Sequence, residues 1–522
     1  MRAVRPMDNV GVRPTVVLPP DGLTFVELID VARHDVNVTL SAEARAGMIR
    51  SRAAVERLAA GTEAIYGVST GFGALANVRI PTVKQHELQH ALLRSHAAGM
   101  GPPIEREVVR AMMLLRARTL AMGYSGVRPI VVESLLALLN AGISPIVPEH
   151  GSLGCSGDLA PLAHIALCLI GEGTATTGAG QLVDGDEALR LADLRPIALE
   201  AKEGLALVNG TDGILGMLIL ACADLRGLFQ LADVTAAMSV EALLGTDAPF
   251  DPRVHALRPH PGQGTSAANL SHMLAGSQIC ASHRGSAHAV QDAYSMRCSP
   301  QVAGAARDTL TFAKAVAERE LGSAIDNPSV LDDGSIASNG NFHGAPLGLA
   351  CDFLAIAAAE VGAIAERRTD RLLDPARSQG LPAFLALDPG TNSGVMLAQY
   401  TAAALVAENR RLAAPASVDS IPTSAMQEDH VSMAWGAARK LRHVVDNLGK
   451  ILAIELVCAA RAIDLRAPLA PAPATGAARD LLREHVAGPG PDRALSPELA
   501  AAEDLVRSGA VLARVSAFVD LA

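Results

Sequence analysis

The sequence has no run of lysine or arginine of the kind that binds a phosphate backbone. Its 522 residues carry 44 Lys and Arg against 54 Asp and Glu, which leaves a formal net charge of −10 at neutral pH. A surface with this balance repels nucleic acid and anionic lipid headgroups more than it attracts them. The composition therefore argues against a nucleic-acid partner and against a membrane partner.

Cysteine is scarce and shows no pairing pattern. Seven cysteines are scattered without a CxxC pair, and an odd number at irregular spacing is a poor disulfide framework. Residues 1–6 are not followed by the apolar segment of a secretory signal. Reduced thiols and the lack of such a signal predict a cytoplasmic protein.

Aromatic residues make up only 3% of the chain, and alternating β-branched runs are few after residue 150. Alanine is abundant, so helices can approach one another closely. From about Thr211 onward, apolar residues recur at helical spacing, most clearly in 347–364 and 437–463. Glycine and proline interrupt the chain before that point. We therefore predict a mainly α fold, with a long central helical bundle and a more irregular N-terminal region.

Three regions follow from these patterns. Residues 1–208 form an N-terminal domain, residues 209–467 form the long-helix bundle, and residues 468–522 combine a break with a terminal helix. The break is rich in proline and glycine over 468–496, and the helix begins at about Pro497.

Two stretches approach the hydrophobicity of a membrane span. The first, 213–223, is too short to cross a bilayer between its flanking acidic residues. The second, 347–364, contains Asp352 and Glu360. Both are predicted to be core helices.

The most informative segment of the chain is Cys155-Ser156-Gly157, because such a tripeptide can modify its own backbone. Gly157 has no β-carbon, so its amide nitrogen can attack the Cys155 carbonyl carbon with little steric cost. Loss of one water closes a five-membered ring, and loss of the Ser156 hydroxyl as a second water leaves an exocyclic methylene. The product, 4-methylidene-imidazol-5-one, is an electrophile that no standard side chain supplies. Taken alone, the tripeptide is far more often an ordinary glycine-rich turn before a helix.

Segments from about Tyr66 to beyond Met433 support the interpretation of the tripeptide as cofactor-forming. Together they resemble the family of histidine and aromatic amino acid ammonia-lyases. The segments stand in the order expected for that family. They are YGVSTGFG from Tyr66, RSHAAG from Arg94, GSLGCSGDLAPL from Gly151, KEGLALVNGT from Lys202, VQDAYSMRC from Val290, NFHG from Asn341 and SAMQEDHVSM from Ser424.

The resemblance implies loss of ammonia from an α-amino acid and a cofactor formed autocatalytically from Cys155, Ser156 and Gly157, with no external cofactor. It also implies a homotetramer whose active sites are shared between subunits. Tyr66 is the candidate base for the β-proton, although a tyrosine with a pKa of about 10 needs neighbouring groups that activate it. Glu428 is the alternative base.

The resemblance also assigns substrate-binding residues. Arg297 is expected to bind the substrate carboxylate through its planar fork, and it lies three residues after Tyr294, on one face if the segment is helical. The other expected contacts are Asn209, Gln291, Tyr294 and Phe342. Neither His164 nor His343 has neighbours in a metal-ligand pattern, so we expect no metal.

His96 and Glu428 resemble the histidine-specific branch of the family. An imidazole substrate has two ring nitrogens that need partners in a buried pocket, and a histidine and a carboxylate provide them. We therefore expect non-oxidative deamination of L-histidine to trans-urocanate and ammonia. An aromatic amino acid ammonia-lyase or a 2,3-aminomutase with the same electrophile stays open, and so does a helical scaffold without activity. Cys155, Asp212 and Met426 depart from the residues of many relatives.

Overall fold

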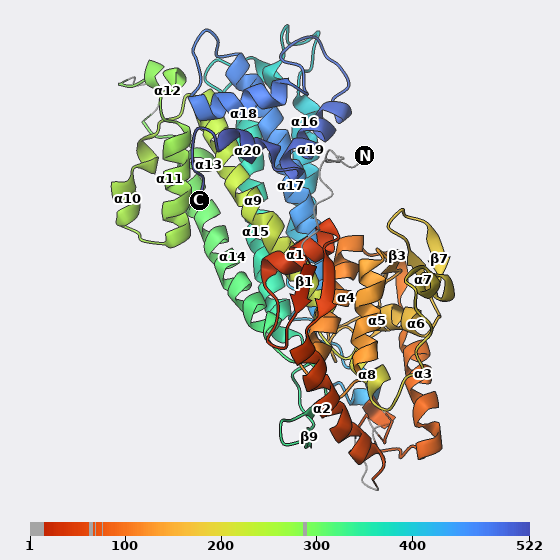
Figure 1. Ribbon diagram of the computed structural model, residues 1–522. Coiled ribbons are helices and arrows are strands. Elements are labelled where there is room, and N and C mark those ends of the chain that lie inside the picture. Colours follow the sequence, from red (N-terminus) through yellow and green to blue (C-terminus); the bar gives the residue numbers. More distant parts are fainter. Residues whose placement is uncertain (1–14, 62–65, 68, 72, 76, 286–289) are drawn as a thin grey trace. The chain divides into compact units, whose positions relative to one another are not determined.

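The computed structural model describes residues 15–522 apart from 62–65, 68, 72, 76 and 286–289. Helices dominate and strands are short (Figure 1), which confirms the predicted mainly α fold. The chain forms two compact units, each made of three stretches. The first unit contains Met1–Leu220, Val316–Gly348 and Ala416–Gly436, and the second contains Ala221–Ala315, Leu349–Pro415 and Ala437–Ala522. The domain boundaries predicted at 208/209 and 467/468 divide the chain into consecutive regions, and they stay a prediction.

Four helices are much longer than the others, and they match the stretches with helical periodicity. They are α9 (Asp212–Ala242), α14 (Ser299–Leu321), α15 (Ala345–Leu373) and α17 (Ala434–Asp464). Of these, α9 and α15 are apolar enough to cross a membrane by length and composition. However, 67% and 56% of their most apolar windows are buried inside the protein, as expected for core helices.

The first unit combines shorter helices with small sheets. Its helices are α1 (Phe25–His34), α2 (Ala42–Ala59), α3 (Gln85–His96), α4 (Arg106–Ala121), α5 (Pro129–Asn140), α6 (Ala160–Leu169), α7 (Gly185–Leu191) and α8 (Glu203–Val208), with 3-10 turns η1 (Gly73–Leu75), η2 (Thr82–Lys84) and η5 (Ser424–Met426). Its strands are β1 (Thr15–Leu18), β2 (Asn37–Leu40), β3 (Met100–Pro103), β4 (Ser144–Pro145), β5 (Pro148–His150), β6 (Thr174–Thr176), β7 (Leu182–Asp184), β8 (Ser329–Val330) and β9 (Ile336–Ala337). β1 pairs with β2 in parallel, Thr15 opposite Asn37, whereas β3–β5, β4–β6–β7 and β8–β9 pair antiparallel.

Helix α4 is buried along nearly its whole length and carries three buried arginines, Arg110, Arg116 and Arg118. Each donates to backbone carbonyls of other segments of the chain. Arg116, for example, donates to the carbonyls of Asn209 and Ile325 at 2.8 and 3.0 Å. The helix therefore fixes the irregular segments that form the walls of the first unit's pocket.

In the second unit, α9, α15 and α17 pack around a buried polar network. The Glu455 carboxylate in α17 accepts hydrogen bonds from Thr235 (2.7 Å) and Ser239 (2.8 Å) in α9. Arg368 in α15 forms an ion pair with the same carboxylate at 2.5 Å. Every charge in this group is paired, as burial requires. These contacts confirm a bundle of long helices.

The remaining elements of the second unit are shorter. They are η3 (Ala248–Phe250), α10 (Pro252–Ala256), α11 (Pro261–Met273), α12 (Gln278–Ser282), α13 (Tyr294–Arg297), η4 (Ala383–Leu385), α16 (Met396–Leu412), α18 (Pro473–Arg483), α19 (Ser496–Arg507) and α20 (Ala510–Val515).

Helix α18 corrects the expectation of an unbroken proline- and glycine-rich break over 468–496. Pro473 is the first residue of the helix, where its missing N–H and fixed φ are tolerated. Alanines and leucines at helical spacing then face the interior. Those buried are Ala474, Ala477, Ala478, Leu481 and Leu482. Proline starts this helix instead of excluding it.

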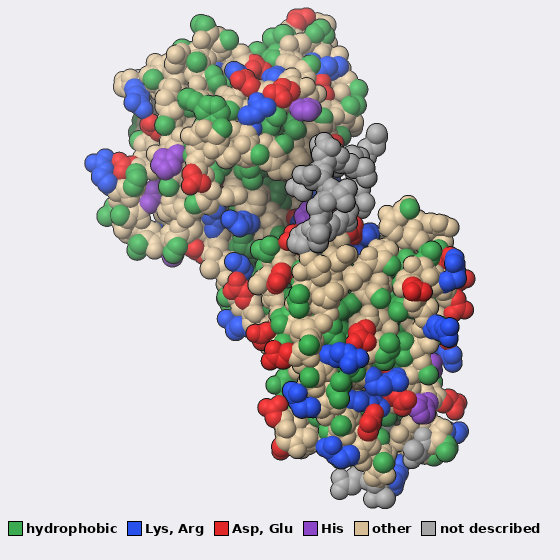
Figure 2. All heavy atoms as spheres, in the orientation of Figure 1, with side chains coloured by type: hydrophobic (Ala, Val, Ile, Leu, Met, Phe, Trp, Pro, Cys, Tyr) green, Lys and Arg blue, Asp and Glu red, His purple; other side chains and the backbone are tan. Residues whose placement is uncertain are grey.

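On the face drawn in Figure 2, basic and acidic side chains lie interspersed, with hydrophobic side chains between them. Neither sign of charge is segregated into one area of that face.

Candidate active site

A pocket of about 500 Å³ in the first unit gathers several of the residues that the sequence singled out. Five predicted residues line it, namely Tyr66, Cys155, Ser156, Phe342 and Glu428. The other residues of its wall are Gly73, Asn327, Ser338, Asn339, Gly340, His343, Gln427, Asp429 and His430. The pocket thus joins the tyrosine loop, the Cys-Ser-Gly loop and the segment of Glu428, which lie far apart in the sequence.

The Cys-Ser-Gly loop is anchored immediately before the tripeptide. The Gly154 carbonyl accepts a hydrogen bond from the Ser432 hydroxyl at 2.6 Å and one from the Gly344 N–H at 3.4 Å. Two distant segments of the chain therefore hold the entrance of the loop.

The loop is also anchored immediately after the tripeptide. The Asp158 N–H donates to the Gly210 carbonyl at 2.6 Å. The Asp158 carboxylate accepts from the Gly213 N–H, at the N-terminus of α9, at 2.5 Å. This is where a helix leaves donors unsatisfied and favours an acidic partner. The tripeptide is thus held at both ends.

Gly157 is pressed against the segment that follows α8. Its φ is 74°, and a β-carbon there would lie 2.1 Å from the Gly210 carbonyl oxygen. Leu159, two residues later, also has a positive φ of 51°. Only glycine fits at position 157. The left-handed backbone of a non-glycine residue such as Leu159 costs roughly 1–3 kcal/mol. The close packing of Gly157 against Gly210 fits a tripeptide whose glycine nitrogen must approach the Cys155 carbonyl carbon.

Asp212, one of the departures from the family pattern, lies beneath this loop and does not line the pocket. It is the first residue of α9, is buried, and forms an ion pair with Arg116 at 3.3 Å. Burial, and then the neighbouring Asp212, raise the pKa of the Asp158 carboxyl, and Arg116 opposes this. Asp212 therefore helps to support the Cys-Ser-Gly loop.

Tyr66 presents its hydroxyl oxygen to the Gly73 N–H at 3.3 Å. Burial raises the pKa of Tyr66, the Gly73 hydrogen bond lowers it, and the carboxylates of Glu428 and Asp326 raise it further. The net shift is upward, so the described neighbours favour the neutral phenol. Two other residues of the predicted tyrosine motif, Val68 and Phe72, lie outside the described residues.

Glu428 is held at the end of a strained turn. The backbones of Thr423 and Glu428 form an isolated bridge, and three non-glycine residues between them, Ser424, Ala425 and Met426, have φ values of 51°, 50° and 70°. Left-handed backbone without glycine persists only where the surroundings enforce it. Met426, another departure, is 66% exposed and is not among the pocket-lining residues.

The Thr423 side chain donates to the Glu428 carboxylate. Its hydroxyl lies 2.8 Å from Oε2, and Cys155 lines the same pocket as Glu428. Burial and then the Glu428 charge raise the pKa of Cys155 to about 12, so the group is a thiol at neutral pH. The third departure from the family pattern thus lies in the pocket, within electrostatic range of a predicted site residue.

His96 ends α3 and does not line the pocket. Its Nδ1 lies 3.1 Å from the Ser95 hydroxyl. Burial lowers the pKa of His96, and both a hydrogen bond with Leu92 and the charge of Glu428 oppose this shift. His96 is therefore within electrostatic range of Glu428 and is mainly neutral.

Asn209 is buried behind the pocket wall. Its side-chain amide donates to Asp326 at 3.2 Å and to the Asn327 carbonyl at 3.0 Å. Asp326 also pairs with the buried Lys202 at 2.5 Å. Asn209 is not among the pocket-lining residues, so its contact with substrate stays a prediction.

Sequence analysis missed Asn327, Ser338 and Asn339, which line the pocket. The Asn327 side-chain oxygen accepts from the Asn339 N–H at 2.9 Å and from the Ser338 hydroxyl at 3.4 Å. With the oxygen engaged in this way, the amide nitrogen of Asn327 remains as a donor beside the pocket. The proximity of Ser338 and Asn339 to the NFHG segment is the signal that could have found them.

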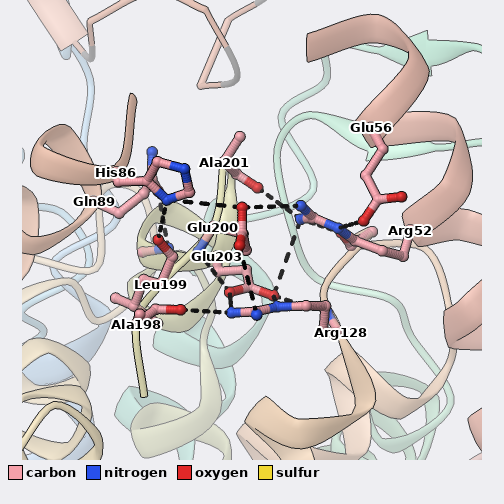
Figure 3. Close-up of polar contacts among 12 residues, drawn as sticks. Arg52, Glu56, His86, Gln89, Arg128, Ala198, Leu199, Glu200, Ala201 and Glu203 are labelled. Atoms are coloured by element: carbon pink, nitrogen blue, oxygen red, sulfur yellow. Dashed lines mark hydrogen bonds and ion pairs between the residues drawn. The ribbon is translucent and has the colours of Figure 1, made fainter. Parts of the chain in front are cut away.

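A network of ion pairs fixes the start of α8, and with it the KEGLALVNGT segment (Figure 3). Glu203, fully buried, accepts from Arg128 through Nε at 2.8 Å and Nη2 at 2.6 Å. Arg52 donates to the Ala201 carbonyl at 2.9 Å and forms an ion pair with Glu56. A bidentate pair of this kind fixes orientation as well as position. The network therefore supports Asn209 from the other end of the helix.

Gln291, Tyr294 and Arg297 belong to the second unit and do not line the pocket. The predicted helical spacing of Tyr294 and Arg297 is confirmed by α13, where the guanidinium lies 4.6 Å from the centre of the Tyr294 ring. Arg297 Nε donates to the Asp292 carbonyl at 2.9 Å, and Tyr294 is 71% exposed. No described contact inside the first unit or inside the second unit brings these residues to Ser156.

His164 and His343, the two histidines considered as metal ligands, have other partners. His164 Nε2 accepts from the Gly99 N–H at 3.0 Å, and the His343 ring stacks on His430 with centres 5.5 Å apart. Among the residues that the structure describes, no group of three or more His, Cys, Asp or Glu is placed to hold a metal ion.

Comparisons with known proteins place the chain in context. A family model described as aromatic amino acid lyase matches residues 23–484. A histidine ammonia-lyase of Streptomyces avermitilis is 58% identical over 499 residues, covering 95% of this chain and 98% of the relative. The crystal structure of histidine ammonia-lyase from Trypanosoma cruzi is 39% identical with a TM-score of 0.88, covering 97% and 96%. The crystal structure of a tyrosine aminomutase from Streptomyces globisporus is 38% identical with a TM-score of 0.93, covering 98% and 100%.

Proposed function

Because the chain belongs to the aromatic amino acid lyase family, we propose that it removes ammonia from L-histidine and leaves trans-urocanate. The reaction is a non-oxidative cleavage of a carbon–nitrogen bond and the first step of histidine degradation. The observation that carries the proposal is the pocket in which Tyr66, Ser156 and Glu428 meet. The 58% identity to a relative named histidine ammonia-lyase supports the choice of substrate.

The pocket holds the tripeptide from which the electrophile is made. The Gly157 nitrogen attacks the Cys155 carbonyl carbon and the oxygen leaves as water, after which Ser156 loses its hydroxyl and α-proton as a second water. The hydrogen bonds at Gly154 and Asp158 hold the loop on both sides of the atoms that close the ring. When formed, 4-methylidene-imidazol-5-one supplies an electrophilic carbon that converts the substrate's amino group into a better leaving group.

Tyr66 takes the β-proton of the substrate. Its phenol requires a nearby positive charge, because burial and two carboxylates raise its pKa. The Gly73 N–H contributes to stabilising the phenolate, and the α-ammonium of a bound substrate brings a positive charge to the same pocket. Glu428 is the alternative base, since it also lines the pocket. A negative charge on either residue disfavours a second charge on the other.

Glu428 and His96 select an imidazole. A carboxylate accepts from a ring N–H, and a mainly neutral His96 offers one donor and one acceptor. A benzene ring leaves these groups without partners, at a cost of about 1–3 kcal/mol each. Selection between histidine and phenylalanine therefore follows from polar groups more than from pocket volume.

The substrate carboxylate binds Arg297, supported by Asn209, Gln291 and Tyr294, while Phe342 packs beside the electrophile. Gln291, Tyr294 and Arg297 belong to the second unit, and Tyr294 is exposed. The resemblance to the family supports their supply to the pocket of a partner subunit in a cytoplasmic homotetramer.

An apolar groove of about 730 Å³ on the second unit supports self-association. The Phe312 and Phe353 rings, 6.0 Å apart, lie in it beside Ile356, and all three side chains are 44–47% exposed. Exposed apolar surface of this kind marks a contact site.

The test is an assay of purified protein with histidine, phenylalanine and tyrosine, in which each product is identified. We expect urocanate and ammonia from histidine, and none from Ser156→Ala. A β-amino acid product would indicate an aminomutase, and deamination of phenylalanine or tyrosine instead of histidine would indicate a different lyase. A protein inactive on all three substrates would be a scaffold, and the proposal would be wrong.

A further inference from the structure

The first unit contains a second cavity, of about 620 Å³, that is separate from the pocket of Ser156. Among the described residues, none lines both. Helix α2 supplies one wall of this cavity, and the turn between β8 and β9 supplies another. Figure 1 shows α2 beside β9. We call it the hairpin cavity, and its volume lies in the range of small-molecule sites.

Two arginines of α2 line the hairpin cavity and lack a partner. Arg50 and Arg57 lie seven residues apart, so both project from the same face of the helix. Among the described residues, no hydrogen bond or ion pair engages either guanidinium. By contrast, Arg45 and Arg52 of the same helix form ion pairs with glutamates. A guanidinium without a partner is suited to bind a carboxylate in bidentate fashion.

Carboxylates line the same cavity. Asp21, Glu43 and Asp332 are exposed, and within the described parts of the chain none of them has an ion-pair partner. Asp333 is engaged instead, because its Oδ1 accepts from the Ser335 N–H at 2.9 Å and from the Ser335 hydroxyl at 2.6 Å. Four carboxylates against two guanidiniums leave the lining with a formal charge of −2. Groups of both signs thus share one cavity but lie too far apart to pair directly.

The β8–β9 hairpin connects this cavity to the pocket of Ser156. Its turn, 331–334, lines the hairpin cavity. The residues that flank its two strands, Asn327, Ser338 and Asn339, line the pocket of Ser156. The two strands pair antiparallel. A short hairpin therefore contributes to the walls of both cavities.

The middle of the hairpin is held firmly. The Val330 N–H donates to the Tyr124 carbonyl at 2.7 Å, and the Val330 side chain packs in a buried cluster with Ala54, Val55 and Ala201. A hydrogen-bonded element that is packed in this way can transmit a change at its turn to its base.

We propose that the hairpin cavity binds a basic α-amino acid and that the bound ligand orders the β8–β9 hairpin. The ligand's carboxylate binds Arg50 and Arg57, and its two ammonium groups bind Asp332 and the neighbouring carboxylates. The formal charge of −2 selects a ligand with a net positive charge, whereas the arginines require that it also carry a carboxylate. The binding of this ligand does not depend on the proposed function.

Calorimetric titration of the full-length protein with L-lysine and with 1,5-diaminopentane, which lacks the carboxylate, tests the site. Asp332→Asn is expected to raise the Kd of both ligands about fivefold, the size of one exposed ion pair. Arg57→Gln is expected to raise the Kd of lysine about fivefold and to leave the diamine bound no more weakly. Arg45→Gln is the matched control, since Arg45 is exposed on the same helix but does not line the cavity.

Two results would overturn the site. One is a lack of saturable lysine binding at low ionic strength. The other is a Kd for lysine that changes in Ser156→Ala or Tyr66→Phe and stays constant in Asp332→Asn, because lysine would then occupy the pocket of Ser156.

Hydrogen exchange followed by mass spectrometry tests the effect on the hairpin. Lysine is expected to slow amide exchange in residues 326–343 of the wild type but not of Asp332→Asn. The β6–β7 segment, 174–184, belongs to the same unit and should exchange at an unchanged rate. Unchanged exchange of 326–343 at saturating lysine would overturn the ordering of the hairpin. Neither measurement needs turnover, so absence of urocanate would refute the proposed function alone.

Discussion

A β-carbon on Gly157 would lie 2.1 Å from the carbonyl oxygen of Gly210. The two residues also form an isolated parallel bridge, so the contact is part of a fixed arrangement of the backbone. The tripeptide from which we propose the electrophile to form is thus pressed against the segment that links α8 to α9. We therefore expect the proposed modification to be sensitive to a single methyl group.

Gly157→Ala is expected to block formation of the electrophile, because the methyl group forces the loop away from Gly210 and the positive φ disfavours alanine. The 155–157 peptide of the wild type should be lighter by two waters than its sequence mass, whereas that of the variant should have the full mass. Peptide mass spectrometry measures both. Gly180→Ala is the matched control, since Gly180 has a φ of 83° and nothing within 4 Å of its added β-carbon. A modified and active Gly157→Ala protein would contradict the prediction.

Tyr66→Phe is expected to keep the electrophile and to reduce turnover of histidine by about 10²–10⁴-fold, the usual contribution of a general base. Because the pKa of Tyr66 is raised, the phenolate fraction of the free enzyme increases as pH rises toward that pKa. The logarithm of kcat/KM should therefore rise with pH on the alkaline side, and the rise should be absent in Tyr66→Phe. Tyr400→Phe, at an exposed position in α16, serves as control. Turnover within a few-fold of wild type would assign the proton to Glu428.

His96→Leu and Glu428→Gln are expected to reduce kcat/KM for histidine far more than for phenylalanine. Each removes a polar partner of the imidazole, worth about 1–3 kcal/mol of transition-state binding. The same changes relieve unpaired groups beside a benzene ring. The measurement is kcat/KM for both substrates in each variant. Equal losses for both substrates would mean that these residues serve the general chemistry.

Lys202→Met is expected to lower the free energy of unfolding by about 3–5 kcal/mol, because it leaves the buried Asp326 carboxylate without its ion-pair partner. Denaturant unfolding measures the change. The double variant Lys202→Met with Asp326→Asn should recover part of the loss, since no buried charge then remains unpaired. Lys84→Met, at an exposed site, should be neutral. A neutral effect of Lys202→Met would show that the pair contributes nothing to the support of Asn209.

The sequence predicted the long helices well because an apolar stripe at helical spacing leaves little choice of structure. It failed at α18, where prolines suggest a break but Pro473 is the first helical residue. The motifs also identified Tyr66, Ser156 and Glu428, which meet in one pocket. Asn327 escaped notice because a single amide in an irregular segment has no periodicity. Its role depends on which of its atoms the neighbouring chain occupies.

The pKa shifts of the site residues could not be predicted from the sequence either. The motif identifies Tyr66 as a candidate base, yet its pKa is raised by burial and by acidic neighbours that only the folded chain brings near. Likewise, Cys155 reads as a neutral replacement in the tripeptide, whereas burial and the charge of Glu428 raise the pKa of its thiol to about 12. Such couplings arise between distant segments, and spacing along the chain carries no record of them.

The anchors of Gly154 and Asp158 have a consequence for biogenesis. They come from Gly210, Gly344 and Ser432, so the loop is anchored on both sides only after chain far to its C-terminal side has folded around it. With the proposed modification, we expect a nascent or truncated chain that lacks residue 432 to keep the unmodified tripeptide. Two missing waters would then mark each molecule that has passed through its native state. The mass of one peptide would count correctly folded molecules, including those that unfold later, since a covalent modification outlasts the fold that produced it.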